Sequence, residues 1–192
     1  MPDQSGLRGP GIFVAIGGAS GVGKDALIAQ LRDRFHDDPR LVFVRRTVTR
    51  AADGTSEDHL STDADTFARE EASGAFAVTW SAHGLAYGLP ALVDTAISEG
   101  RVVVANVSRT VLPILRARYR HVVPIMITAE RAVVMHRLAA RGRESAGDIA
   151  QRLSREVESS TEGWIRLDNS GEIAVAAAEL SRIIEAQLAA VG

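Results

Sequence analysis

The stretch IFVAIGGASGVGKD, residues 12–25, decides the fold of this chain. Its apolar beginning is typical of a short buried strand, and the residues after it read as a glycine loop that opens a helix. Gly18 and Gly23 stand five positions apart and Lys24 follows, which matches the phosphate-binding loop G-x-x-x-x-G-K-[ST] at seven of eight positions. The eighth position holds Asp25, where Ser or Thr is expected.

The loop has the parts that a polyphosphate site needs. Glycines let successive N–H groups point at phosphate oxygens, the start of the helix adds the positive end of its dipole, and the lysine ammonium reaches the outer phosphates. Lys24 is the single lysine beside 21 arginines, which suggests a task for a compact, flexible charge. The residues expected to bind ATP are Gly18, Ala19, Ser20, Gly21, Val22, Gly23, Lys24 and Asp25. The alternative is a glycine-rich turn without a ligand.

The composition predicts a soluble globular protein. The chain has 192 residues, of which 46% are hydrophobic, enough to bury a full core. A net charge of −2 provides no basic field for nucleic acid, and the absence of cysteine excludes disulfides and thiolate metal sites. Residues 1–10 lack the apolar core of a signal peptide, and no run of about 18 apolar residues could span a membrane. We therefore expect a cytoplasmic protein that binds neither nucleic acid nor a membrane.

Strand and helix patterns alternate along the chain, which predicts an α/β fold with a parallel sheet and helices on both faces. The expected strands span residues 12–16, 41–49, 101–106, 124–128 and 164–167. The expected helices span residues 24–35, 63–72, 90–99, 110–119, 129–141, 148–159 and 173–190. Residues 1–11 read as a flexible tail and residues 12–192 as a single domain. Within it, residues 51–88 or so form an inserted lobe, whose part from 75 to 88 reads as short strands or a folded loop.

Polar side chains follow two of the expected strands at their carboxyl ends, where ligands lie in such sheets. Arg46 and Arg50 close the second strand, and the third strand ends in Asn106, Ser108 and Arg109. Because guanidinium forks suit phosphate oxygens, we expect an acceptor substrate that itself carries phosphate. For any single arginine, the alternative is a surface salt bridge.

Further stretches resemble guanylate kinase and its relatives, in the same order and over nearly the whole chain. They are the loop at 18–25, TVTR at 47–50, GLAYG at 84–88, and RGRES at 141–145 followed by Arg152-Leu153. Within that group the chain resembles the ribose 1,5-bisphosphate phosphokinase family, which acts in phosphonate breakdown. The stretches that carry this likeness are the Gly-Lys-Asp end of the loop, SEDH at 56–59, WSAHGL at 80–85, VANVSR at 104–109, ARY at 117–119 and GRE at 142–144.

This resemblance implies an activity and a lid. The activity is the ATP-dependent phosphorylation of ribose 1,5-bisphosphate to 5-phosphoribosyl 1-diphosphate, with ADP as co-product and Mg²⁺ bound to the nucleotide. The lid would lie at residues 141–148 or so. By the same resemblance, the arginines of the lid would neutralise, together with Lys24, the negative charge of the phosphoryl group during its transfer. These arginines are Arg141, Arg143 and Arg152. The acceptor phosphate is already an oxyanion at neutral pH, so no general base is expected.

The resemblance also makes the inserted lobe the acceptor-binding lobe. His59, His83 and Tyr87 would contact the sugar or its phosphates there, together with the polar residues at the strand ends. The alternative for the two histidines is an ordinary place on the surface. Small molecules are the expected partners of the protein, and a homodimer stays open.

Three positions depart from the guanylate kinase pattern. Val78 stands where that enzyme presents a glutamate to guanine, His59 replaces a tyrosine that holds the GMP phosphate, and Asn106 replaces an aspartate. A valine cannot accept hydrogen bonds from the base, so guanine should fit poorly. We hypothesise that Asp25 supplies the missing carboxylate as a ligand to Mg²⁺. The alternative is that Asp25 only stabilises the start of the helix.

Three functions are compatible with these observations. The first is the sugar-phosphate kinase, the second is a nucleoside monophosphate kinase with relaxed base choice, and the third is a catalytically silent binding module of the guanylate-kinase type. The presence of Lys24 and of the lid arginines argues against the third function. Val78 argues against guanine as the base, but not against every base.

Overall fold

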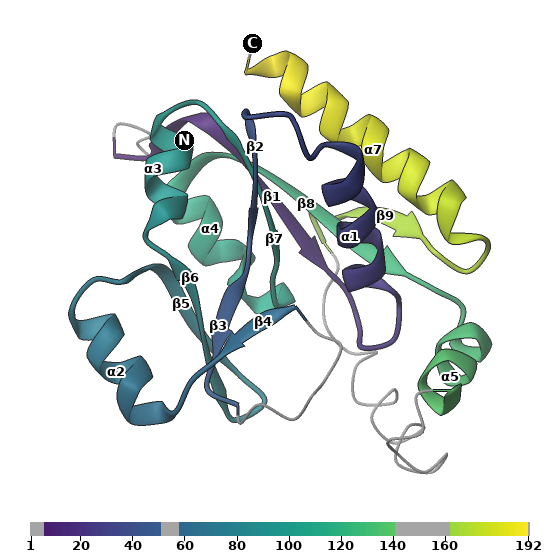
Figure 1. Cartoon of the computed structure of the whole chain (residues 1–192), viewed down its shortest axis with the longest axis horizontal. Helices are drawn as coiled ribbons and strands as arrows, with labels where there is room; N and C mark the ends of the chain where they lie inside the picture. The colour runs from purple at the N-terminus through teal and green to yellow at the C-terminus, as the bar shows by residue number, and fades with distance from the viewer. Residues whose placement is uncertain (1–5, 51–57, 141–161, 192) are drawn as a thin grey trace.

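Five parallel strands form the central sheet in the computed structural model, which describes residues 6–50, 58–140 and 162–191. The order across the sheet is β2-β7-β1-β8-β9, so β1 lies in the middle (Figure 1). The strands are β1 (Arg8–Gly17), β2 (Leu41–Val44), β7 (Val102–Asn106), β8 (Tyr119–Thr128) and β9 (Ile165–Asp168). The predicted parallel α/β fold is thus confirmed.

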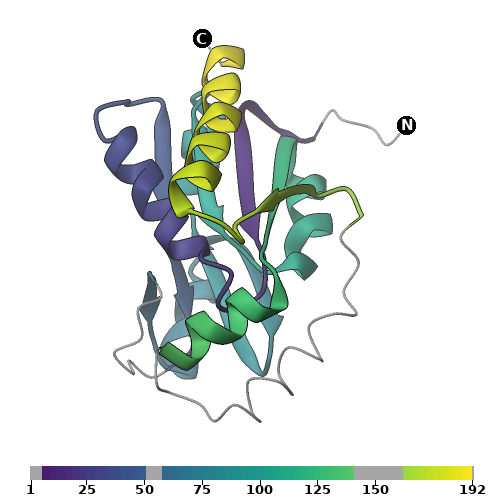
Figure 2. The same cartoon turned by 90° about the vertical axis from the view of Figure 1, so that its right-hand side faces the viewer.

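Helices cover both faces of this sheet, as predicted. One face carries α1 (Lys24–Arg34), α5 (Arg131–Ala140) and α7 (Ile173–Ala190), and the other carries α3 (Leu92–Ser98), the 3-10 turn η1 (Arg109–Val111) and α4 (Leu112–Arg118). Figure 2 shows α7 beside α1 over the same face. Among the described residues, no helix is both long and apolar enough to cross a membrane.

Two hydrophobic cores lie on either side of the sheet, because successive side chains of a strand point to opposite faces. Ile12, Val14 and Ile16 of β1 enter the core beneath α1, α5 and α7. Phe13 and Ala15 enter the core beneath α3 and α4. All five side chains are buried. The continuous apolar run therefore has the cause expected for a parallel strand, which is burial on both faces.

A second sheet lies beyond the carboxyl end of β2 (Figure 1). Its order is β4-β3-β6-β5, with one parallel and two antiparallel pairings. The elements are β3 (Arg46–Val48), β4 (His59–Ser61), α2 (Ala64–Ala72), β5 (Phe76–Ala82) and β6 (Leu85–Pro90). The predicted folded segment 75–88 is therefore a β-hairpin. Asp63 caps the expected helix α2 by accepting a hydrogen bond of 2.8 Å from the Thr66 amide.

Several predicted boundaries were wrong. The strand expected over residues 41–49 is two strands, since the chain leaves the central sheet at Arg45 and joins the second sheet. Pro90 ends β6 and does not begin a helix, and Pro124 lies within β8 and not at its start. β1 already begins at Arg8, inside the segment expected to be a tail. The helix expected over residues 148–159 lies outside the described residues.

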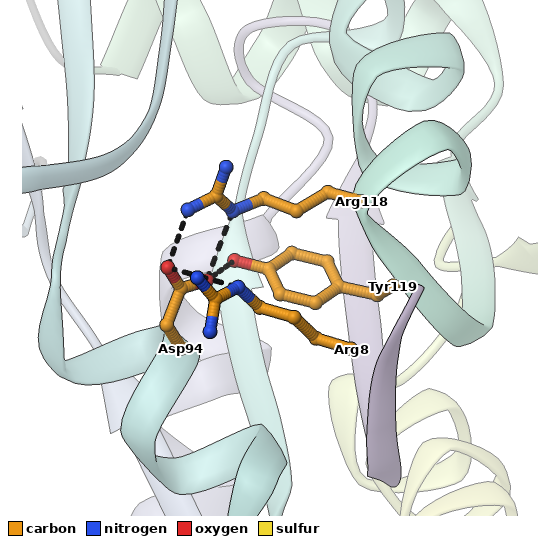
Figure 3. A network of polar contacts seen from close by, with 4 residues as sticks. All are labelled: Arg8, Asp94, Arg118 and Tyr119. Atoms are coloured by element: carbon orange, nitrogen blue, oxygen red, sulfur yellow. Dashed lines mark hydrogen bonds and ion pairs between the residues drawn. The ribbon is translucent and has the colours of Figure 1, made fainter. Parts of the chain in front are cut away.

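A polar network joins four elements at the end of the sheet where β1 and β8 begin (Figure 3). Asp94, in the first turn of α3, accepts hydrogen bonds from Arg118 at the end of α4 and from the Tyr119 hydroxyl. Arg8 adds an ion pair of 3.3 Å to the same carboxylate. The network thus ties the first strand to two helices on one face of the sheet.

Candidate active site

The loop between β1 and α1 is shaped by its glycines. Gly18, Gly21 and Gly23 all have positive φ, and at Gly23 φ is 96°. A Cβ at Gly23 would lie 2.5 Å from Nδ2 of Asn169, so any side chain there would displace its neighbour. Lys24 Nζ donates hydrogen bonds of 2.8 Å to the carbonyl oxygens of Gly18 and Ala19. The loop therefore curls around the ammonium group, at the carboxyl end of β1.

Asn169 holds this loop from the far edge of the sheet, and the sequence analysis missed it. It follows β9 directly, and its amide nitrogen donates a hydrogen bond of 2.8 Å to the Val22 carbonyl. Arg137 of α5 donates to the same carbonyl at 3.3 Å. Asn169 is only 2% exposed, so this bond is shielded from water. The signal in the sequence is an amide residue directly after a parallel strand.

A row of three polar side chains links the loop to the second sheet. Asn106, the last residue of β7, donates a hydrogen bond of 3.0 Å from Nδ2 to Oδ1 of Asp25. Its Oδ1 accepts a hydrogen bond of 3.1 Å from Nη1 of Arg46, the first residue of β3. Asn106 is 8% exposed. One buried amide thus forms hydrogen bonds both to the carboxylate of Asp25, next to Lys24, and to Arg46 of the second sheet.

Aromatic rings support Arg46 in the second sheet. The Arg46 guanidinium carbon lies 5.6 Å from the ring centre of Tyr87, a cation–π contact. Trp80 stacks on Tyr87 with ring centres 5.3 Å apart, and its indole nitrogen donates a hydrogen bond of 2.9 Å to Ser108 Oγ. Both rings are buried. The structure therefore brings Arg46, Tyr87, Asn106 and Ser108 together, and Trp80 is a member of this group that we had not singled out.

The other residues predicted to bind the acceptor differ in their position relative to Arg46. His59 of β4 is the strand partner of Arg46, and its Nδ1 is buried without a hydrogen bond to any described residue. Arg50 follows β3 and Arg109 begins η1, and both are partly buried. His83 lies at the exposed turn of the β5–β6 hairpin, with a φ of 52°. The lid arginines Arg141, Arg143 and Arg152 lie outside the described residues.

Asp58 makes a second connection between α1 and the second sheet. It forms ion pairs with Arg32 of α1 and with Arg45, the residue between β2 and β3. Asp58 lies in the segment expected to form the inserted lobe, and the sequence had given it no role. The carboxylate therefore braces the point at which the chain passes from one sheet to the other.

The described residues suit a metal that is held mainly by phosphate. They contain no group of three or more His, Cys, Asp or Glu side chains that could hold an ion alone. Asp25 offers one half-buried carboxylate beside Lys24, oriented by Asn106. Mg²⁺ usually takes one or two carboxylates together with water and substrate phosphates. The donor set thus fits Mg²⁺ bound with a nucleotide.

Comparisons with known proteins agree on one family. The chain is 45% identical over 166 residues to the ribose 1,5-bisphosphate phosphokinase PhnN of Chelativorans sp. (strain BNC1), which covers 85% of this chain and 79% of the relative. It is 46% identical over 178 residues to the protein of the same name from Rhodopseudomonas palustris, covering 93% and 90% of the two chains. A scan of family models gives no match.

Among solved structures, guanylate kinase from Anaplasma phagocytophilum has a similar fold. The TM-score is 0.63 at 22% sequence identity, and the superposition covers 95% of this chain and 89% of that one. At such low identity the likeness concerns the fold alone. Because the identity to both curated relatives is 45% or more over most of each sequence, this chain belongs to the ribose 1,5-bisphosphate phosphokinase family.

Proposed function

We propose that this protein transfers the γ-phosphoryl group of ATP to the 1-phosphate of ribose 1,5-bisphosphate, giving 5-phosphoribosyl 1-diphosphate and ADP. An oxygen of the 1-phosphate forms a bond to the γ-phosphorus, while the bond from this phosphorus to the β–γ bridging oxygen breaks and ADP leaves with the electron pair. The observation that carries the proposal is the contact between the phosphate loop and the second sheet through Asp25, Asn106 and Arg46. This contact supports the proposal because it joins a loop with the phosphate-binding pattern to an arginine that suits a second phosphate, in a member of this family.

The donor would bind at the loop from Gly18 to Asp25. Backbone N–H groups of the loop and the start of α1 would face the phosphates of ATP, and Lys24 would exchange its carbonyl partners for phosphate oxygens. Asp25 would hold Mg²⁺ together with the phosphates, and the ion would offset their negative charge. Asn169 would keep the loop in this shape.

The acceptor would bind on the second sheet, in an acceptor-binding lobe that includes residues 51–88 or so. Arg46 offers a guanidinium fork that is held in place by Tyr87 and Asn106, which suits a phosphate group. The other residues proposed for acceptor binding are Arg50, His59, His83, Ser108 and Arg109. The lid at about residues 141–148, with Arg141, Arg143 and Arg152, would neutralise the phosphoryl group during transfer. A cytoplasmic setting, where ATP is available, belongs to the same proposal.

The second sheet favours a sugar phosphate over a nucleotide as acceptor. Val78 is 4% exposed and belongs to the core that also holds Trp80 and Tyr87. An apolar side chain there gives the polar edge of a purine base no hydrogen-bond partner, and unpaired polar groups are strongly rejected in such sites. We therefore propose that GMP is a poor phosphoryl acceptor for this protein.

Phosphoryl transfer with MgATP tests the proposal directly. Ribose 1,5-bisphosphate and GMP are offered in parallel, ADP release is followed, and the product is identified by phosphorus NMR. We expect a new diphosphate on the ribose and no reaction with GMP. Transfer to GMP alone would make the protein a nucleoside monophosphate kinase, and transfer to neither would overturn the proposed acceptor. The lysine variant described in the Discussion serves as the control for contaminating kinases.

A further inference from the structure

Asn106 uses both ends of its side-chain amide, and its partners fix which end points where. Arg46 can only donate a hydrogen bond, and the carboxylate of Asp25 can only accept one. Nη1 of Arg46 therefore faces Oδ1 of Asn106 at 3.1 Å, and Oδ1 of Asp25 faces Nδ2 at 3.0 Å. A flipped amide would place donor against donor and acceptor against acceptor. The buried amide thus has one orientation that satisfies both charges.

We propose that Asn106 is a positioning residue, a neutral spacer that keeps Arg46 and Asp25 apart and in register. This inference rests on the proposed function in which Asp25 serves the metal–nucleotide side and Arg46 the acceptor side. The opposite charges of Arg46 and Asp25 both lie beside the buried Asn106. They attract each other strongly there, because the protein screens charges less than water does. A direct ion pair would occupy both groups with each other. The amide gives each charge a hydrogen bond of its own and keeps the two charges from pairing with each other.

Other residue types at this position would not do the same work. A carboxylate would pair with Arg46 but repel Asp25, and it would add negative charge beside the phosphates. An alanine would remove both side-chain hydrogen bonds and the volume that separates the two charges, and it would leave the 3.5 Å bond from Arg46 to the backbone carbonyl of residue 106. Only a short amide supplies an acceptor on one side and a donor on the other at this length. The chain differs from the guanylate kinase pattern in having Asn106 in place of an aspartate and Asp25 in place of a Ser or Thr. On this inference the two differences belong together.

The test measures nucleotide binding without any acceptor, so it needs no turnover. The Mg²⁺ concentration that gives half-maximal ADP binding is measured by calorimetry for the wild type and for N106A, R46M and the double variant N106A/R46M. In N106A we expect this concentration to rise about 10-fold, the scale seen when a partner of a metal ligand is lost. R46M alone should stay within about twofold of the wild type, because Arg46 does not serve the nucleotide side.

The double variant separates the spacer from a merely structural role. If Arg46 captures Asp25 once the amide is gone, removal of Arg46 frees the carboxylate, and N106A/R46M should return to within about twofold of the wild type. S181A, which alters a buried polar residue on α7, controls for the loss of any buried polar group. Thermal unfolding of each variant shows that it is folded, and N106S replaces N106A if the alanine variant does not fold.

Several outcomes would overturn the inference. No change in the Mg²⁺ requirement of N106A would mean that Asp25 does not need the amide. A double variant as weak as N106A would mean that the amide acts through packing. Absence of MgADP binding in the wild type would overturn both this inference and the proposed function. Normal binding results with no transfer to ribose 1,5-bisphosphate would overturn the proposed acceptor and leave the role of Asn106 toward the nucleotide side standing.

Discussion

The hydroxyl of Tyr119 donates a hydrogen bond of 2.9 Å to the carboxylate of Asp94, across 25 positions of the chain. This bond joins the first residue of β8 to the first turn of α3, at the opposite end of the sheet from the phosphate loop. Burial raises the pKa of Tyr119, and the negative charge of Asp94 raises it further. Tyr119 therefore stays a hydrogen-bond donor throughout the neutral pH range. The contact serves the fold and not the proposed reaction.

We predict that D94N lowers the free energy of unfolding by about 2 kcal/mol, the scale of hydrogen bonds to charged groups. The amide keeps the shape of the side chain but removes the charge that pairs with Arg118 and Arg8. Urea unfolding followed by circular dichroism measures the loss. D38N is the matched control, because Asp38 pairs with Arg40 on the surface and its loss should change stability little. Equal effects of the two variants would contradict the prediction.

Acid should remove the advantage that Asp94 provides. Burial alone would raise the pKa of Asp94, but hydrogen bonds from Arg118 and Tyr119 outweigh it, so the pKa lies below its usual value. A group with a lowered pKa in the folded state stabilises the protein above its unfolded pKa of about 3.9, and this contribution disappears as the pH falls through the folded value. The difference in Tm between the wild type and D94N should be full at pH 7 and shrink below about pH 4. A difference that stays constant down to pH 2 would refute this assignment.

Replacing Lys24 by methionine should abolish most of the catalysis. The ammonium is the flexible charge held inside the phosphate loop, and the loss of one such electrostatic contact commonly costs about 10² to 10³ in kcat. Stability should change little, because methionine fills a similar volume. Steady-state kinetics with MgATP and thermal unfolding measure the two effects. A variant with more than about a tenth of wild-type kcat would show that Lys24 is not the charge we propose.

Loss of the Asn169 amide should weaken nucleotide binding more than acceptor binding. Among the described residues, N169A leaves the buried Val22 carbonyl with the longer bond from Arg137 alone, at a cost of about 1–3 kcal/mol. Because the hydrogen bonds of Asn169 within the described part of the chain go to Val22 of the loop and to Thr128, we expect KM for ATP to rise about 10-fold with little change in KM for ribose 1,5-bisphosphate. Competition with a fluorescent ADP analogue confirms the effect on binding. An equal rise in both KM values would assign Asn169 a general structural role.

Arginine and lysine should not be interchangeable at position 46. R46K keeps the positive charge but loses the planar group that lies over Tyr87 and the fork that reaches Asn106. We predict an increase of about 10-fold in KM for ribose 1,5-bisphosphate, while KM for ATP stays within about twofold. Arg69 on α2 provides the control R69K, because its guanidinium is exposed and bonds only to Thr66 among the described residues. An unchanged acceptor KM in R46K would remove Arg46 from the acceptor site.

The sequence predicted the central sheet well because its signals are local. The apolar run of β1, the glycine loop and the helix that follows each depend on neighbouring residues, and the structure has them where they were expected. The same holds for α7, whose predicted bounds agree with the structure. The carboxyl ends of parallel strands lie at one edge of the sheet, so Asn106 and Arg46 could be expected near the loop. The hydrogen bonds from Arg46 to Asn106 and from Asn106 to Asp25 could not, because they join positions that are 60 and 81 residues apart.

The errors arose where tertiary pairing decides. Residues 41–48 form an almost unbroken β pattern, and nothing local shows that the chain changes sheets at Arg45. Pro124 was expected to start a strand because it lacks an N–H group. It is tolerated inside β8 because the pairing with β9 begins only at Ile125, so no described strand pairs with that side of β8 at Pro124. Asn169 could be recognised only once β9 was known to end beside the loop.

Because Lys24 is the single lysine of the chain, a chemical reagent can label the phosphate loop selectively. Lys24 is held there by two backbone carbonyls, and no other side-chain amine exists in the sequence. A lysine-selective acylating reagent therefore has one side-chain target, and an adduct that peptide mass spectrometry maps to Lys24 reports one accessible loop. Protection from labelling would then measure nucleotide occupancy in any mixture, without a reporter group added to the protein.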